Sequence, residues 1–321
     1  MVNRVLSPGF DPQVVVITGA TGVGKTALAI EVARRIGGEV ISADSRQVYH
    51  YMDVGTAKPT AAERAAAPHH LIDVVYPDEP FSVATYQHLG ERALADIAGR
   101  GRVALIVGGS PHYIQALVDR LQPGPRSPVL RRWLERADAR DGPSRLNRWL
   151  AVLDPLAART IDPRNRRRVI RALEVTIATG IPFSRSGRQR GVAIPARWIG
   201  LRRDRRGLHE ILAQRFDRML QHGWLDEVRT LLAMGFEPTL PSMSATGYAD
   251  LAQVVLQRAQ LGEARDRVLH ATHAFVRRQE TWLRAERRVE WFDAADPTLA
   301  DRVVRALREP SGLAPRGAAA D

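Results

Sequence analysis

Short apolar runs alternate with amphipathic stretches over residues 13–120. The runs at residues 14–17 and 103–107 are rich in β-branched residues and end at glycine, which is typical of buried strands. The stretches at residues 27–33 and 84–98 carry apolar positions at helical spacing. This alternation predicts an α/β fold, with a parallel sheet core flanked by helices.

The same patterns predict further elements along the chain. They are strands at residues 39–42, 71–75, 198–201 and 289–292, the last at a sheet edge, and helices at residues 208–232 and 264–284. Gly223 is expected to break the first of these two helices.

The middle of the chain differs in character from its flanks. Beyond residue 121 the sequence is helical and heavily basic, and Trp133 and Trp149 with neighbouring leucines are expected to form a small core. We interpret this segment as a helical insertion into the α/β core. The expected division is a disordered N-terminus at 1–12, core at 13–120, basic insertion at 121–195, a mostly helical continuation of the core at 196–308, and a disordered tail at 309–321.

Charge is the unusual feature of the composition. Among 321 residues, 47 Lys and Arg face 35 Asp and Glu, which leaves a formal net charge of +12. This excess favours a polyanionic partner such as nucleic acid. An Arg-rich composition throughout the chain is the alternative reading.

Other classes of protein are excluded by what the sequence lacks. It has no cysteine, so disulfides, thiolate metal sites and cysteine nucleophiles are ruled out. No apolar run approaches the ~20 residues that span a bilayer, and the N-terminus does not read as a signal peptide. We expect a cytoplasmic protein without membrane contact.

The first predicted strand leads directly into a glycine-rich loop that opens a helix. The loop comprises Gly19, Ala20, Thr21, Gly22, Val23, Gly24, Lys25 and Thr26. In this setting backbone N–H groups turn toward a phosphate, Lys25 reaches an outer phosphate and Thr26 can hold a magnesium ion. The loop predicts phosphate binding, but it does not identify the molecule that carries the phosphates.

Polar residues follow two other predicted strands. Asp44 and Gln47 come after the strand at 39–42, and Gly108, Gly109 and Ser110 follow the strand at 103–107. In a parallel sheet these loops meet at one edge, beside the phosphate loop. In phosphate-loop ATPases a late strand usually delivers an acidic residue to magnesium. Here that strand is followed by glycines and a serine, which argues against an ATPase. Asp73 could still be the acidic residue that binds magnesium.

Seven stretches together are more specific than the phosphate loop alone. They are residues 19–26, 41–49, 52–59, 68–73, 168–175, 247–248 and 277–282. In this combination the chain resembles the transfer-RNA dimethylallyltransferases, also called isopentenyltransferases, over about residues 13–295. The run from Asp44 to Pro59 carries most of the specificity.

The resemblance implies a prenyltransferase with a phosphate-loop core. Family members move a dimethylallyl group from dimethylallyl diphosphate to the exocyclic amine of the adenosine just 3′ of the anticodon, releasing diphosphate with magnesium present. The family's helical insertion grips the anticodon stem, which agrees with the basic segment described above. A monomer is expected.

The resemblance also suggests roles for single residues. Asp44 suits a general base that accepts the amine proton, while an Asp that caps the following turn is the alternative. Thr26 and Ser110 are the other candidate catalytic residues, with the Ser110 hydroxyl holding the amine or ribose. Arg215 is a candidate for the diphosphate, although an exposed helical arginine is an equal reading.

The target adenine must leave its stack and enter the channel between the two glycine-bearing loops. Expected RNA contacts are Asp44, Ser45, Arg46, Gln47, Ser110, Arg132, Arg167, Arg168, Val169, Ile170, Arg171, Ser244, Ala245, Thr246, Gly247, Tyr248, Ala249 and Arg278. For the arginines, phosphate neutralisation is the physical role. A solvated basic helix face is the alternative for any one of them.

Some positions depart from the family pattern. Pro111 replaces a glycine of the second loop and fixes φ near −65°, so the backbone around Ser110 is expected to differ. Asn165 stands where the family commonly has Asp. Neither departure involves Asp44, Lys25 or Thr26.

Three rival functions use the same loop. They are a small-molecule phosphotransferase or ATPase, a prenyltransferase acting on free adenine nucleotides, and a non-catalytic RNA-binding protein with a structural nucleotide site. The basic insertion argues for a polynucleotide substrate, since a mononucleotide needs no such footprint. The non-catalytic reading leaves the placement of Asp44 unexplained.

Overall fold

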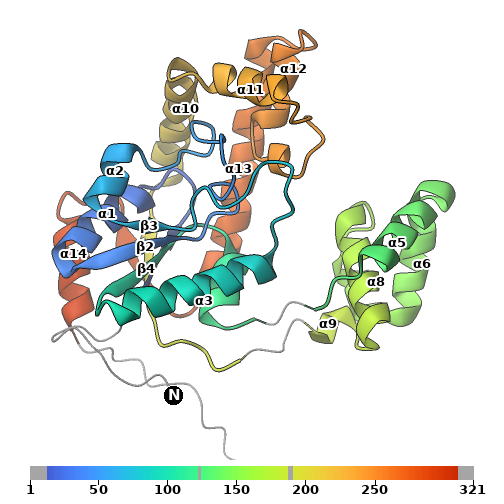
Figure 1. Cartoon of the computed structure of the whole chain (residues 1–321), viewed down its shortest axis with the longest axis horizontal. Coiled ribbons are helices and arrows are strands. Elements are labelled where there is room, and N and C mark those ends of the chain that lie inside the picture. Colours follow the sequence, from blue (N-terminus) through green and yellow to red (C-terminus); the bar gives the residue numbers. More distant parts are fainter. Residues whose placement is uncertain (1–12, 122–123, 187–190, 310–321) are drawn as a thin grey trace, which may run out of the picture. The chain divides into compact units, whose positions relative to one another are not determined.

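A parallel sheet forms the centre of the α/β core. The computed structural model describes residues 13–121, 124–186 and 191–309. Its six-stranded sheet has the order β3-β2-β4-β1-β5-β6, and every pairing is parallel (Figure 1). The strands are β1 (Val14–Gly19), β2 (Gly38–Ser42), β3 (His69–His70), β4 (Val103–Val107), β5 (Arg197–Arg202) and β6 (Val289–Asp293). The α/β prediction is confirmed.

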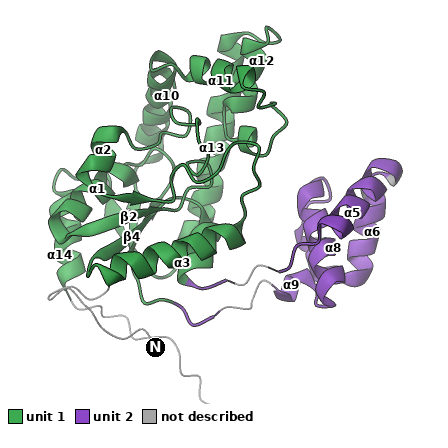
Figure 2. Ribbon diagram, in the orientation of Figure 1, with its two compact units in different colours: residues 1–118, 194–321 green, residues 119–193 purple. Residues whose placement is uncertain are grey.

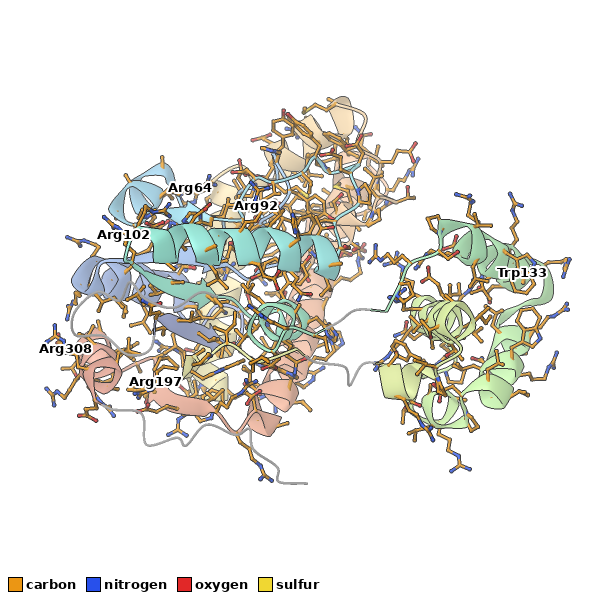
Figure 3. The ribbon with its side chains drawn as sticks, turned by 60° about the horizontal axis from the view of Figure 1, so that its bottom comes forward. Arg64, Arg92, Arg102, Trp133, Arg197 and Arg308 are labelled. Carbon is orange, nitrogen blue, oxygen red and sulfur yellow. The ribbon has the colours of Figure 1, made fainter. Side chains whose placement is uncertain are left out.

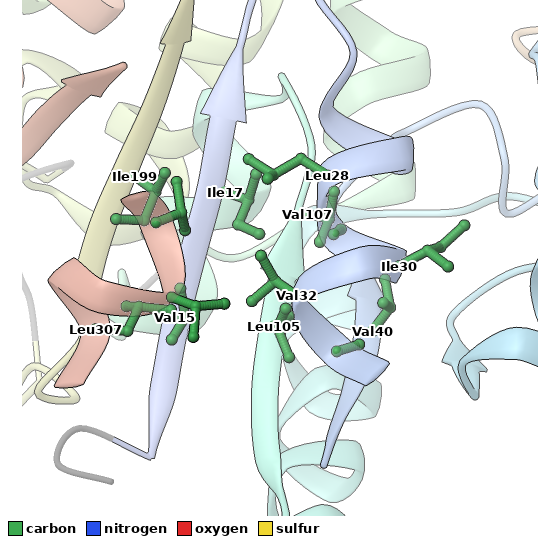
Figure 4. Close-up of a cluster of buried hydrophobic side chains, with 14 of the residues drawn as sticks. Val15, Ile17, Leu28, Ile30, Val32, Val40, Leu105, Val107, Ile199 and Leu307 are labelled. Atoms are coloured by element: carbon green, nitrogen blue, oxygen red, sulfur yellow. The ribbon is translucent and has the colours of Figure 1, made fainter. Parts of the chain in front are cut away.

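Both faces of the sheet are covered, which explains why its strands read as continuous apolar runs. Val15 and Ile17 of β1 point to one face, where they join a cluster with α1 (Lys25–Ile36) and α14 (Leu299–Arg308) (Figure 4). Val14 and Val16 point to the other face, where α3 (Val83–Gly99) and α4 (Pro111–Val118) pack. The period of two along β1 thus supplies both halves of the core.

A third apolar cluster lies under the helices that follow β5. Its members include Phe216 of α10 and Trp224 of α11. The expected break in the long helix is confirmed, because Gly223 takes a left-handed φ of 89° between α10 and α11. The remaining elements of this unit are α2 (Ala61–Ala66), α10 (Arg205–Gln221), α11 (Trp224–Ala233), η1 (Ser242–Ser244), α12 (Tyr248–Val255) and α13 (Leu261–Ala285).

The chain divides into two compact units. The first comprises residues 1–118 and 194–321 and the second residues 119–193, against the 121–195 expected from sequence (Figure 2). The second unit is helical, with α5 (Pro128–Asp141), α6 (Pro143–Leu153), α7 (Pro155–Thr160), α8 (Arg166–Thr179) and α9 (Phe183–Ser186). Proline at the first position of α5, α6 and α7 starts each helix where no N–H is needed.

Two sequence-based expectations are wrong. Residues 71–75 do not form a strand: Leu71 and Asp73 take positive φ, so the chain bends after the short β3. Trp133 is not a core residue, because it is 53% exposed. The disorder expected at residues 1–12 and 309–321 falls outside the described residues, except at residue 309.

Candidate active site

The phosphate loop joins β1 to α1 at the carboxyl edge of the sheet. Gly22 and Gly24 have φ of 80° and 103°, which residues with a side chain rarely adopt, so both glycines are required by the backbone. Gly24 is the N-cap of α1, and Lys25 and Thr26 begin the helix. The N–H groups of this first turn have no partner within the helix and are available to an anion.

Lys25 is held by the loop itself. Its Nζ donates hydrogen bonds to the carbonyl oxygens of Gly19 at 3.0 Å and Ala20 at 2.8 Å. Desolvation by burial lowers the pKa of Lys25 to about 8, with Asp44 opposing the shift and Arg215 adding to it. An anion entering the loop would restore the preference for the charged ammonium group.

Arg215 reaches the same place from α10. Burial lowers the pKa of its guanidinium, Asp44 raises it and Arg218 lowers it. Of the two readings left open by the sequence, the structure favours the functional one, because Arg215 lines a cavity together with Lys25 and Asp44. Two cations and one carboxylate therefore converge at this point.

Asp44 follows β2 and faces the phosphate loop. Its Oδ1 accepts a hydrogen bond from the backbone N–H of Arg46 at 2.8 Å, so the turn-capping interpretation holds for one oxygen. Among the described residues no further hydrogen bond reaches this carboxylate, and Asp44 lines the cavity. The cap orients the side chain and leaves the second oxygen for chemistry.

Two cavities adjoin at these charges. The first has a volume of about 320 Å³ and the second about 380 Å³. Lys25, Asp44 and Arg215 line both of them. The phosphate-loop residues that line the second cavity are Thr21, Gly22, Gly24, Lys25 and Thr26. The first has an apolar wall from α10 and α13, formed by Leu212, Phe216, Met219, Val268, Leu269 and Phe275.

This apolar wall was not identified from the sequence. Helical periodicity shows which face of α10 is apolar, but it does not show what lies against that face. The first cavity thus combines apolar side chains with Asp44 and with Thr21 and Lys25 of the phosphate loop.

Gln279 on α13 connects the phosphate loop to the second glycine loop. Its Oε1 accepts from the N–H of Thr21 at 2.9 Å, and its Nε2 donates to the carbonyl of Gly109 at 2.8 Å. Gln279 is 4% exposed, so these bonds are shielded from water. The carboxamide fixes the spacing between the two loops.

Ser110 lines the first cavity at the N-terminus of α4. Pro111 is the first residue of α4, where proline fits without loss of a hydrogen bond, and the difference in loop backbone expected from the sequence stays a prediction. The carbonyl of Ser110 accepts from the N–H of Tyr113 and of Ile114, which anchors the loop to the helix.

Arg46 and Gln47 are engaged in contacts within the protein. The Arg46 guanidinium donates to the carbonyl of Pro241 at 2.9 Å and to Ser244 Oγ at 3.3 Å. The Gln47 amide donates to the carbonyls of Thr56 and Ala57 and accepts from the Ser42 hydroxyl. In this structure both side chains position loops; Arg46 also lines the first cavity and Gln47 the second, and Ser45 lines the first.

Glu227 is a site residue that the sequence did not reveal. Its carboxylate accepts hydrogen bonds from the N–H groups of Asp53, Val54 and Gly55, and from the hydroxyl of Tyr248. One side chain of α11 thereby shapes the loop that carries Gly55 and Thr56 into the first cavity. No local motif marks this residue, because its partners lie far away in the sequence.

Asp73 does not serve the phosphate loop. Its carboxylate accepts from Lys58 Nζ at 2.5 Å and from Arg64 at 2.9 Å, and it lines neither cavity. The alternative that gave Asp73 the acidic role beside magnesium is therefore wrong. Lys58 is buried and also donates to Asp53 and to the carbonyl of Tyr49, so this group of charges is structural.

Residues 244–249 are split between surface and core. Ser244, Thr246 and Ala249 are exposed, and the first two line the cavity rim with Ala245. Gly247 and Tyr248 are buried, and the Tyr248 ring is fully covered. The expected RNA contact by the Tyr248 side chain is wrong for that reason. Arg278 is exposed at the rim, over the Phe275 ring.

In the second unit, the expected RNA residues separate in the same way. Arg132, Arg167 and Arg168 are exposed, and none has an ion pair with any described residue. Val169 and Ile170 are 3% and 5% exposed within the apolar core, which rules out RNA contact by their side chains. Asn165 caps α8 by accepting from the N–H of Arg168, a task that an Asp performs equally well.

Arg171 is only partly available. Its guanidinium donates to the carbonyls of Gly124 and Pro125 and to the Glu174 carboxylate. It therefore ties the start of the second unit to α8.

Two features are absent from the described residues. No helix there is long and apolar enough to cross a membrane. No group of three or more His, Cys, Asp or Glu side chains there could hold a metal ion.

Comparison with known proteins gives one consistent result. The IPP transferase family matches residues 47–286 and the isopentenyl transferase family residues 12–72. A tRNA dimethylallyltransferase of Thermomicrobium roseum is 44% identical over 307 residues, covering 93% of this chain and 92% of the relative. One from Roseiflexus sp. is 48% identical over 278 residues, covering 84% and 89%.

Solved structures agree. A tRNA isopentenylpyrophosphate transferase of Bacillus halodurans superposes with a TM-score of 0.66 at 36% identity, covering 92% of this chain and 94% of that one. A eukaryotic dimethylallyltransferase described as acting on tRNA gives a TM-score of 0.77 at 26% identity, covering 91% and 77%. The resemblance noted in the sequence is confirmed, and the chain belongs to the IPP transferase family, whose relatives here are tRNA dimethylallyltransferases.

Proposed function

We propose that the protein transfers a dimethylallyl group from dimethylallyl diphosphate to the exocyclic amine of the adenosine 3′-adjacent to the anticodon in transfer RNA, and that diphosphate is released. The observation that carries this proposal is the meeting of Lys25, Asp44 and Arg215 where a cavity with a phosphate loop adjoins a cavity with an apolar wall. Family membership supports the same reaction.

The donor's diphosphate binds in the phosphate loop. The N–H groups of Gly22, Gly24, Lys25 and Thr26 and the Lys25 ammonium face the charge that grows as the carbon–oxygen bond breaks, and Arg215 adds a second cation. Groups fixed in advance stabilise such charge without reorganising. The apolar wall formed by Leu212, Phe216 and their neighbours suits the hydrocarbon chain of the donor.

The acceptor amine meets Asp44. An exocyclic adenine amine is a weak nucleophile, and a carboxylate that takes its proton as the carbon–nitrogen bond forms helps the reaction. The Asp44 oxygen that does not cap the turn is free for this step. Ser110, across the first cavity, has a hydroxyl that can hold the amine or the ribose.

The residues around Thr26 fit a magnesium ion of the kind bound mainly by substrate oxygens. Thr26 and Asp44 line one cavity, and together they offer a hydroxyl and one carboxylate. Magnesium in phosphate sites is often bound through one or two carboxylates plus phosphate oxygens and water. When bound, the ion would neutralise charge on the leaving diphosphate. Thr26 would hold it through its hydroxyl, and Asp44 stays free to take the amine proton.

The RNA is gripped by the arginines of the second unit. Arg132, Arg167 and Arg168 project without ion pairs among the described residues, and a polynucleotide fits the net charge of +12. Residues at the rim, such as Arg46, Ser244 and Arg278, would contact the extruded base or its neighbours. We expect this enzyme to act in the cytoplasm. A monomer is sufficient for the reaction, because one chain lines both cavities.

The test is incorporation of labelled dimethylallyl diphosphate into bulk transfer RNA with magnesium, beside adenosine monophosphate as acceptor and an ATP-hydrolysis control. We expect label in RNA alone. Label in the mononucleotide would shift the function to small-molecule prenylation. ATP hydrolysis without label in either acceptor would overturn the proposal.

A further inference from the structure

An exposed tryptophan stands on the second unit where the sequence predicts a core residue. Trp133 of α5, which is labelled in Figure 3, is 53% exposed, although its neighbour Leu134 is fully buried. An exposed indole keeps a large apolar face in water, which folding alone does not favour. Single exposed apolar residues are common, so the surroundings of Trp133 decide whether it has a role.

Trp133 belongs to an ordered aromatic stack. Its ring lies 5.3 Å from the Trp149 ring of α6, at an interplanar angle of 7°. The guanidinium carbon of Arg145 lies 5.0 Å from the centre of the Trp149 ring. Trp149 is partly buried against the core of this unit. The inner indole thus supports the outer one, which holds Trp133 in a fixed orientation with its outer surface exposed.

The two helices that carry the stack also carry exposed arginines beside it in the sequence. Arg132 precedes Trp133, Arg136 follows it by one helical turn, and Arg148 precedes Trp149. Across the described ranges no ion pair is found for any of these three arginines. The nearby carboxylate of Glu135 is paired with Arg131 instead. A rigid aromatic face flanked by uncompensated arginines complements a nucleic acid better than an apolar protein surface.

We infer that Trp133 is a stacking platform for an unpaired base of the transfer RNA, distinct from the adenosine that reacts. This inference rests on the proposed function and extends it to a second RNA contact. The base must be unpaired because a helical stem keeps the faces of its bases covered, whereas loop bases can splay out onto an aromatic ring. Arg132, Arg136 and Arg148 neutralise the phosphates beside it.

The test measures RNA binding by the full-length chain. The fluorescence anisotropy of labelled transfer RNA reports binding, and dimethylallyl diphosphate is left out. Trp133→Leu keeps an apolar side chain against Trp149 but removes the aromatic face, and we expect binding to weaken about ten-fold. Trp133→Phe should recover most of the affinity. Val152→Ala, at an 81% exposed apolar position of α6, is the matched control and should bind as the wild type does.

Kinetics supply a readout that a structural role would not give. In Trp133→Leu we expect a raised KM for RNA, with unchanged kcat and unchanged KM for the donor. Quenching of tryptophan emission on RNA binding should be smaller in this variant than in the wild type. Equal RNA affinity in Trp133→Leu and wild type overturns the inference. The inference also fails if Trp133→Leu changes only the self-association of the protein and not its RNA affinity.

The outcomes separate this inference from the proposed function. A wild-type chain that neither binds transfer RNA nor incorporates label contradicts both. A wild-type chain that does both, while Trp133→Leu matches it, overturns the role of Trp133 alone. Should Trp133→Leu lower the melting temperature, the Phe variant decides, since loss of affinity in a stable Trp133→Phe protein also contradicts base stacking.

Discussion

The charged groups that we assign to function are held differently in the two units. In the first unit, Lys25 is bonded to carbonyls of its own loop and Glu227 gathers three backbone N–H groups. In the second unit, Arg167 and Arg168 of α8 are exposed and make no ion pair with a described residue. The first arrangement holds its groups in defined positions, while the second provides a positive surface.

The difference reflects two kinds of task. Bond making needs groups held at defined places before the substrates arrive, because reorganisation during the reaction adds to the barrier. Binding a polyanion needs charge more than position, and long arginine side chains that remain free can adapt to a phosphate backbone. We therefore assign catalysis to the first unit and most of the RNA affinity to the second.

The largest effect is expected at Asp44. Asp44→Ala should lower kcat by about 10²–10⁴-fold, the range for loss of a general base, while RNA binding is largely preserved. Asp96→Ala removes a carboxylate from an exposed position of α3 and serves as the charge-matched control. Rates from single-turnover assays would decide, and undiminished turnover in Asp44→Ala would remove this residue from the mechanism.

Glu227 should affect both stability and rate. Glu227→Ala leaves the N–H groups of Asp53, Val54 and Gly55 and the Tyr248 hydroxyl without their acceptor. We expect a loss of about 1–3 kcal/mol in the free energy of unfolding, with a raised KM because the loop at the cavity is no longer shaped. Glu210→Ala, on the exposed face of α10, is the control. Denaturant curves that coincide with the wild type would refute the assigned role.

Lys25 predicts a pH dependence of diphosphate binding. Its pKa is lowered to about 8 by burial, so the free enzyme loses this positive charge as pH rises through that value. Affinity for inorganic diphosphate should fall above pH 8, by up to about ten-fold per pH unit, since binding then takes up a proton. The Lys25→Arg variant keeps a positive charge at every pH tested. It serves as the control for pH effects that come from ionisation of diphosphate itself. Parallel pH profiles of diphosphate affinity for the two proteins would exclude Lys25 as the source of the pH dependence.

The same shift affects folding with a defined sign. An unfolded lysine keeps its proton to about pH 10.4, whereas folded Lys25 releases it near 8. Between these values the unfolded chain binds more protons, so the contribution of Lys25 makes the protein more stable as pH rises. In the Lys25→Met variant this rise in the free energy of unfolding should be smaller.

The smallest effect per residue is expected for the exposed arginines. Arg167→Gln with Arg168→Gln should weaken RNA binding and reduce the salt slope by about two, roughly one per phosphate contact. Arg171 is unsuitable for this test, because its loss would also break the contacts to Gly124 and Pro125. Arg305→Gln with Arg308→Gln on α14 is the matched double control. An unchanged salt slope in the first pair would mean that this face of α8 meets only solvent.

Much of the fold follows from local sequence. The strand at Val103–Val107 is confirmed with its predicted bounds, because a wholly apolar run between helices suits only a strand buried on both faces. The strand predicted at residues 71–75 is wrong because composition does not report backbone conformation, and Leu71 and Asp73 take positive φ. The prediction that Trp133 is a core residue is wrong because helical periodicity identifies an apolar face without showing whether another element covers it.

The site was predicted to the extent that its residues form short motifs. The phosphate loop and the loops after β2 and β4 meet at one sheet edge, as parallel topology requires. Glu227 and its partner Asp53 are separated by 174 residues, and Gln279 and Thr21 by 258. Contacts over such distances arise from tertiary packing, and no local pattern encodes them.

The most direct test of this division of labour combines variants of the two units. Single-turnover rate and RNA dissociation constant are measured for Asp44→Ala, for Arg167→Gln with Arg168→Gln, and for the triple variant. We predict that the first changes only the rate, the second mainly the affinity, and that the triple variant shows the product of both effects. A loss of RNA affinity in Asp44→Ala as large as its loss of rate would contradict the assignment of catalysis and RNA binding to separate units.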